Sequence, residues 1–217
     1  MANAINTAKT FDETAITFSK PMKNKMGGNM VYMNYGGDKG KVCIQTPMMY
    51  APFGLSKLVD DKTGATKWSL DVSFRDAPGV SEYRKVMESL DVMIKKKAVE
   101  NSVEWFGKQH SVEIIEELYR PIVKPAKDPS KYAPTMKAKL MERDGVFQAK
   151  VYDHETREAI DVMDITKGSH VQMIVQCDTV WFVGKTQFGV TWKLVQARVM
   201  CNKPAQEIAF IEDDDED

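Results

Sequence analysis

The chain has 217 residues, of which 43% are hydrophobic and 28% charged, with 30 basic residues against 31 acidic ones. These values are typical of a soluble globular protein, and no apolar run is long enough to cross a bilayer. Residues 1–10 lack the basic start and apolar core of a signal peptide. Cys43, Cys177 and Cys201 are far apart and odd in number, so we expect a reducing, intracellular setting and no disulfide framework.

Alternation of apolar and polar residues with period two predicts half-buried strands along much of the chain. In the clearest case Trp68, Leu70, Val72 and Phe74 share one face, which predicts core positions. The strands expected in chain order are 15–20, 30–35, 41–46, 67–75, 136–140, 146–152, 171–183 and 190–199.

The last two strands are the longest. Apolar residues alternate from Val171 through Cys177 to Trp181 and Val183, and residues 184–189 form a plausible hairpin loop. In the final strand the apolar face switches parity between Leu194 and Val195. This switch predicts a β-bulge or a barrel corner.

The middle of the chain has helical periodicity. Val80, Tyr83, Met87, Leu90 and Ile94 recur at helical spacing, and three lysines at 95–97 suit the negative end of the helix dipole.

A second helix is expected to begin at Asn101, where Asn101 and Glu104 would form a capping box. Its apolar positions would be Val103, Phe106, Ile114 and Leu118, with a break near Gly107. The proline-rich stretch 121–129 then resists both helix and central strand.

The element order predicts a mainly β fold with a helical insertion. We expect a five-stranded oligonucleotide-binding (OB) barrel, with two helices inserted between strands. The domain would span 1–209, with the helical insertion at about 79–120 and an acidic tail at 210–217. A β-sandwich with a helical flap is the alternative.

Signals of an enzyme or a metal site are poor. The glycines at 36, 37 and 40 lack the spacing and following helix of a phosphate loop, and they indicate a hairpin turn. Asp161 with Asp164, or Asp153 with Glu155, could hold a divalent metal, but carboxylates in turns are far more often simply solvated. We therefore expect no catalytic residue, no metal and no cofactor.

Aromatic and basic residues are interleaved on the expected strands. Single-stranded nucleic acid needs this combination, because bases stack on aromatic rings, at roughly 1–3 kcal/mol per base, while cations follow the phosphates. The competing interpretation is that Trp68, Phe74 and Trp181 are core and that outward lysines merely discourage edge pairing. The aromatic residues are Tyr32, Tyr35, Tyr132, Phe147, Tyr152, Trp181, Phe182, Phe188 and Trp192.

The chain ends in six consecutive acidic residues, which must stay hydrated. Without these six of the 31 acidic residues, the body has 30 basic residues against 25 acidic ones, a charge of about +5. A basic body joined to an acidic string suggests a polyanion-binding protein that carries its own competitor, although a plain solubility tail is the alternative. The acidic residues are Glu212, Asp213, Asp214, Asp215, Glu216 and Asp217.

Three features together carry a family resemblance: the segment 131–140 (KYAPTMKAKL), the long strands around Trp181 and Trp192, and the acidic end. The chain resembles the single-stranded DNA-binding proteins of nucleo-cytoplasmic large DNA viruses, which are related to the replication protein of short-tailed coliphages. The resemblance implies an OB barrel that binds single strands without sequence preference in viral replication, recombination and repair. It also implies an acidic tail that competes with DNA and recruits viral replication proteins.

The resemblance implies DNA contact at eight residues: Lys131, Tyr132, Lys137, Lys139, Lys150, Lys185, Lys193 and Arg198. The phage protein ends in an aromatic residue, whereas this chain ends in Asp217, so any aromatic anchor in the tail falls to Phe210.

The expected partners are single-stranded DNA and viral replication proteins, with no membrane, and a homodimer is compatible with this interpretation. We expect the protein in the host cytoplasm (the viral factory) or the nucleus, and packaging in the virion is left open. The alternative function is a virion-associated structural protein that uses the barrel for protein contacts.

Overall fold

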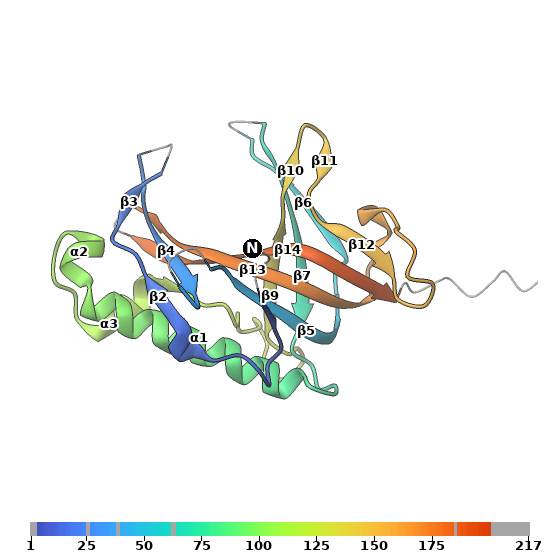
Figure 1. The fold of residues 1–217 in the computed structure, drawn as a ribbon, viewed down its shortest axis with the longest axis horizontal. Helices are drawn as coiled ribbons and strands as arrows, with labels where there is room; N and C mark the ends of the chain where they lie inside the picture. The colour runs from blue at the N-terminus through green and yellow to red at the C-terminus, as the bar shows by residue number, and fades with distance from the viewer. Residues whose placement is uncertain (1–3, 25–26, 38–39, 62–63, 185, 201–217) are drawn as a thin grey trace, which may run out of the picture.

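The computed structural model describes residues 4–24, 27–37, 40–61, 64–184 and 186–200 (Figure 1). Two long strands at the end of the described chain cross its centre, and a long helix lies beneath the sheet. The elements in chain order are β1 (Ile5–Asn6), η1 (Glu13–Ala15), β2 (Ile16–Phe18), β3 (Met22–Lys23), β4 (Asn29–Tyr35), β5 (Val42–Tyr50), β6 (Leu55–Val59), β7 (Thr66–Ser73), α1 (Val80–Glu100), α2 (Ser102–Phe106), α3 (Val112–Leu118), β8 (Tyr119–Arg120), β9 (Thr135–Leu140), β10 (Glu142–Arg143), β11 (Val146–Phe147), β12 (Lys150–Asp153), η2 (Val162–Asp164), β13 (His170–Val183) and β14 (Gln187–Met200).

Five strands close into a ring in the order β5, β7, β9, β14 and β13, and β13 pairs back onto β5. The pair between β9 and β14 is parallel and the other four are antiparallel. A single residue pair, Tyr50 with Ser73, joins β5 to β7. This is the five-stranded OB barrel predicted from the sequence, and ring closure excludes the sandwich alternative.

The β13–β14 hairpin confirms the predicted bulge. Ile174 pairs with Gln196 and Val175 with Leu194, so Val195 is the extra residue on β14. Burial then continues on the shifted parity at Ala197 and Val199.

A second irregularity in β13 makes one prediction wrong. The register of β13 also shifts between Cys177 and Val180, so Val180 and Phe182 turn inward. Trp181 is therefore half-buried, and Val183 is exposed.

Helix α1 forms as predicted and covers the barrel core from below (Figure 1). Its residues Val80, Tyr83, Met87, Leu90 and Ile94 are all buried.

A side chain of the same helix also forms hydrogen bonds with the proline-rich segment 121–129. The carboxylate of Asp91 accepts hydrogen bonds from the Tyr119 hydroxyl at 2.6 Å and from the backbone N–H groups of Ile122 at 2.8 Å and Val123 at 3.2 Å. One buried side chain thus ties the segment after α3 to α1.

The expected second helix is two short helices, α2 and α3. The break at Gly107 is confirmed, with φ at 80°. The capping box is wrong, because the Asn101 side chain donates to the Lys97 carbonyl at the end of α1 and makes no cap bond to α2. In α2, Trp105 and Phe106 are buried while Val103 is exposed, and after the break Ile115 rather than Ile114 is buried.

Other connections follow turn chemistry. The glycines at 36 and 37 have positive φ in the turn between β4 and β5, as expected of a hairpin rather than a phosphate loop. The predicted strand 146–152 is divided into β11 and β12. Asp144 (φ 53°) and Gly145 (φ 77°) form the tight turn between β10 and β11, where both central residues need positive φ.

Among the helices in the described ranges, none has both the length and the apolarity to span a membrane. The predicted boundary at 209/210, Phe210 and the acidic residues of the tail lie outside the described residues.

Candidate nucleic-acid interface

Four of the predicted contact residues line the outer surface of the barrel along β14. Lys139 of β9 lies opposite Lys193 of β14, and Lys150 of β12 lies opposite Gln196, two residues before Arg198. Residues paired on adjacent strands project from the same face of the sheet. We call Lys139, Lys150, Lys193 and Arg198 the basic strip.

The β14 bulge is what places Lys193 and Arg198 on the same surface. The two residues are five positions apart, and in a regular strand they would project from opposite faces. The extra residue Val195 restores the outward direction at Gln196 and Arg198, while Ala197 and Val199 fill the core.

The strip carries more positive charge than its neighbours neutralise. Lys193 Nζ lies 3.0 Å from both carboxylate oxygens of Asp178. Among the described residues, Lys139 Nζ reaches only the Thr191 hydroxyl, at 3.4 Å. Within the described ranges, Lys150 and Arg198 have no ion pair.

The excess of positive charge in the basic strip affects the pKa of Lys139. Burial lowers the pKa of its ammonium below the ordinary value, and the charges of Lys67, Lys137 and Lys193 lower it further. A bound anion would relieve this crowding of like charges. Lys67, on β7, was not singled out in the sequence, although it lies on the polar face of the clearest alternating strand.

Lys137 and Lys131 are placed differently. Lys137 lies on the outer face of β9 beside the strip, but its Nζ is 3.3 Å from Asp71, whose side chain is only 13% exposed. Lys131 pairs with Asp128 at 3.4 Å in the loop before β9, where Tyr132 is 67% exposed. The structure therefore does not join Lys131 and Tyr132 to the strip, and Lys185 lies outside the described residues.

Most of the aromatic residues near β14 belong to the core. Phe182, Phe188 and Trp192 are buried, so they cannot serve as stacking platforms, contrary to the sequence interpretation. Tyr35 stacks on Phe11, with 5.4 Å between ring centroids.

The core prediction for three other aromatics is confirmed for Phe74, which is buried, and supported for Trp68, which is partly buried and packs against the core, but it is wrong for Trp181. Trp68 and Trp181 are half-buried. The indole N–H of Trp68 donates to Glu142 at 2.6 Å.

The carboxylates considered for a metal have structural roles. Asp161 and Asp164 form a capping box around η2. Asp153 accepts hydrogen bonds from the backbone N–H groups of Glu155 and Thr156. The part of the chain that the structure describes holds no cluster of three or more metal-ligating side chains.

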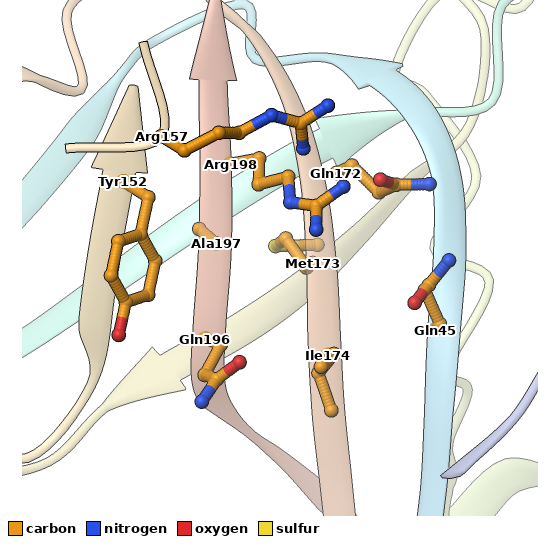
Figure 2. A pocket seen from close by; sticks show the side chains of 9 residues that line it. All are labelled: Gln45, Tyr152, Arg157, Gln172, Met173, Ile174, Gln196, Ala197 and Arg198. Atoms are coloured by element: carbon orange, nitrogen blue, oxygen red, sulfur yellow. The ribbon is translucent and has the colours of Figure 1, made fainter. Parts of the chain in front are cut away.

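A pocket of about 460 Å³ adjoins the end of the basic strip (Figure 2). It lies over β5, β13, β14 and β12, and we name it the Arg157 pocket. Arg157 and Arg198 extend in the same direction across it, towards Gln172 (Figure 2). Its remaining polar or aromatic lining residues are Gln45, Tyr152 and Gln196.

Arg198 and Tyr152 were singled out in the sequence, but the pocket's other members were missed. Gln45 and Gln172 belong to strands far apart in the chain, and Arg157 lies in the turn after β12. No local motif connects them, because barrel closure alone brings them together.

Comparison with known proteins identifies a family. A model described as a family of unknown function (DUF5871) matches residues 70–212. The chain belongs to this family. Its matched region includes β9, β12, β13 and β14, which together carry the basic strip. No curated protein matches the chain.

A solved structure shares the fold at low sequence identity. The single-stranded DNA-binding protein gp2.5 of bacteriophage T7 is 11% identical, with a TM-score of 0.50 over 79% of this chain and 98% of the phage protein. The single-stranded DNA-binding protein of bacteriophage Enc34, solved with single-stranded DNA, is 10% identical, with a TM-score of 0.48 over 86% of this chain and 97% of that one. The likeness to the T7 protein supports the OB assignment.

Proposed function

We propose that this protein binds single-stranded DNA without sequence preference and acts as a binding protein rather than an enzyme. The observation that carries the proposal is the basic strip on the outside of a closed OB barrel. Cations spaced along one strand suit a phosphate backbone, and they carry no information about base sequence. The T7 protein that shares this fold is named as a single-stranded DNA-binding protein.

The competing explanation for outward lysines does not fit β14. Lysines commonly protect a sheet edge against pairing with another chain. However, β14 has β13 on one side, and β8, β9 and β12 pair successively along the other. A strand paired on both sides needs no such protection, so Lys193 and Arg198 call for another role.

We further propose a role in viral DNA replication, recombination and repair, in a protein of nucleo-cytoplasmic large DNA viruses. Its site of action would be the viral factory or the host nucleus. The acidic residues at 212–217 would compete with DNA for the basic strip and recruit viral replication proteins, with Phe210 as the aromatic contact. These proposals rest on the family resemblance and on the charge contrast between tail and body.

The test compares oligo-dT, oligo-U and duplex DNA of about 20 nucleotides, longer than the roughly 4–16 nucleotides that one OB fold covers. We expect the full chain to bind both single strands and to bind the duplex more weakly. Absence of single-strand binding at about 50 mM salt, where phosphate contacts are strongest, would overturn the proposal.

Tail competition has its own test. A chain truncated after residue 209 should bind oligo-dT more tightly than the full chain, most clearly at low salt, where charge screening is weakest. Equal affinity would show that the tail does not compete with DNA.

A further inference from the structure

We propose that the Arg157 pocket is a nucleotide subsite, in which the strand bound along the basic strip places one phosphate and one base. This inference rests on the proposed function and extends it to a surface beyond the lysines. The pocket is continuous with the strip because Arg198 belongs to both and Gln196 lies between Lys193 and Arg198 on β14. From Lys193 to Arg198 a strand rises by roughly 13–16 Å, so a nucleic-acid chain must extend along the barrel to occupy both.

The pocket offers positive charge without a protein counter-ion. Within the described part of the chain, the guanidinium groups of Arg157 and Arg198 form no ion pair or hydrogen bond. Two guanidinium groups directed over the same pocket repel each other, and an anion between them removes that cost. Arginine is suited to phosphate because its planar donors can form two parallel hydrogen bonds.

The remaining lining suits a nucleobase. Tyr152 lies on β12 opposite Arg198 and presents a half-buried ring at the side of the pocket (Figure 2). The side-chain amides of Gln45, Gln172 and Gln196 form no hydrogen bond within the described ranges. Each amide carries both donors and acceptors, and it can rotate to match different base edges. An aromatic face with adaptable amides therefore accommodates a base without demanding one sequence.

The backbone at Arg157 supports a functional role for this side chain. Arg157 has φ at 64°, in the left-handed region that non-glycine residues rarely adopt. Its N–H donates to the Asp153 carbonyl at 3.2 Å, in the turn where the Asp153 carboxylate accepts two further N–H groups. The turn thus holds the arginine in an unfavourable conformation that places it at the pocket, as is often found at ligand-binding sites.

The decisive variant combines Arg157→Asn with Arg198→Gln. Asparagine tolerates the left-handed backbone, so the turn should persist and the melting temperature should stay unchanged. We expect about tenfold weaker binding of a 20-nucleotide oligo-dT at about 50 mM salt. The salt slope should fall in magnitude by about 0.7, because the two arginines share one phosphate and each phosphate contributes roughly 0.7 on single strands. A matched control, Lys85→Gln with Lys96→Gln, removes two exposed charges from α1 and should alter neither quantity.

A second variant tests the base. Tyr152→Leu should weaken oligo-dT binding about tenfold, because a stacked base is lost, yet leave binding of inorganic polyphosphate unchanged. Equal weakening of both ligands would reduce the pocket to a phosphate site and overturn the nucleotide assignment.

Two results would overturn the inference while leaving the proposed function intact. One is unchanged oligo-dT affinity in the arginine variant, while Lys139→Gln with Lys150→Gln weakens it. The other is a free nucleoside monophosphate that binds the wild type and not the arginine variant, with oligonucleotide affinity equal in both. Failure of the wild type to bind oligo-dT at all would refute both proposals.

Discussion

Removing two cations from the basic strip should change the salt dependence of binding by a predictable amount. If Lys139, Lys150, Lys193 and Arg198 each neutralise one phosphate, log affinity falls against log salt with a slope of about −2.8, at roughly 0.7 per phosphate on single strands. Affinity then drops about 50-fold between about 50 and 200 mM salt. The variant Lys139→Gln with Lys150→Gln keeps two of the four contacts, so its slope should be about −1.4 and its drop about sevenfold.

The two substitutions are chosen because neither lysine has a carboxylate partner within the described ranges. Replacing Lys137 instead would leave the nearly buried Asp71 unpaired and confuse binding with stability. Fluorescence anisotropy with labelled oligo-dT across a salt series measures the slope, and circular dichroism checks the melting temperature. A slope equal to that of the wild type, or an equal change in the Lys85→Gln, Lys96→Gln control, would refute the assignment of the strip.

Three further predictions follow from individual contacts. Asp91→Asn should cost about 2–4 kcal/mol of unfolding free energy in urea melts, because its amide N–H₂ must face a hydrogen-bond donor. A loss below about 1 kcal/mol would contradict the role of Asp91 in tying the segment after α3 to α1. A bound phosphate should raise the lowered pKa of Lys139 again, so oligo-dT affinity should fall as pH rises from neutrality towards 10.5, the ordinary lysine value. The fall should be less steep in Lys139→Gln. Parallel pH profiles of the two proteins would argue against phosphate contact at Lys139. Gly54→Ala should lower the melting temperature by more than about 4 °C, because the new Cβ would lie 2.6 Å from the Lys167 backbone nitrogen. Gly64 also has positive φ, but a Cβ there meets nothing within 4 Å, so Gly64→Ala should lower the melting temperature less. Equal losses would show that backbone conformation, and not the steric clash, determines the loss of stability.

Local patterns predicted the parts of this molecule that depend on local physics. The alternation in 136–140 correctly placed Lys137 and Lys139 outside and Met136, Ala138 and Leu140 inside. It could not show that Asp71, on a different strand, would pair with Lys137, while Lys139 has no carboxylate partner among the described residues. Charge partners across strands depend on register, and a linear pattern does not contain the register.

The errors among the aromatics and helices have the same origin. Trp181 was assigned to the core on strict alternation, and the irregularity between Cys177 and Val180 reversed its direction. In the helical region, one residue in the left-handed conformation, Gly107, reset the phase, so Ile115 rather than Ile114 is buried. In both places a single local irregularity changed which of the following side chains face the core.

The bulge at Val195 shows how the same kind of irregularity can build a site. The sequence already showed that the apolar face of the strand changes parity, because Ala197 and Val199 must face the core after Leu194. The switch also decides which polar residues face outward, because Gln196 and Arg198 would otherwise project into the barrel. One inserted residue therefore preserves the core and aligns Lys193 with Arg198 on the outer surface. The continuity between the basic strip and the Arg157 pocket is thus a consequence of how β14 fills the barrel.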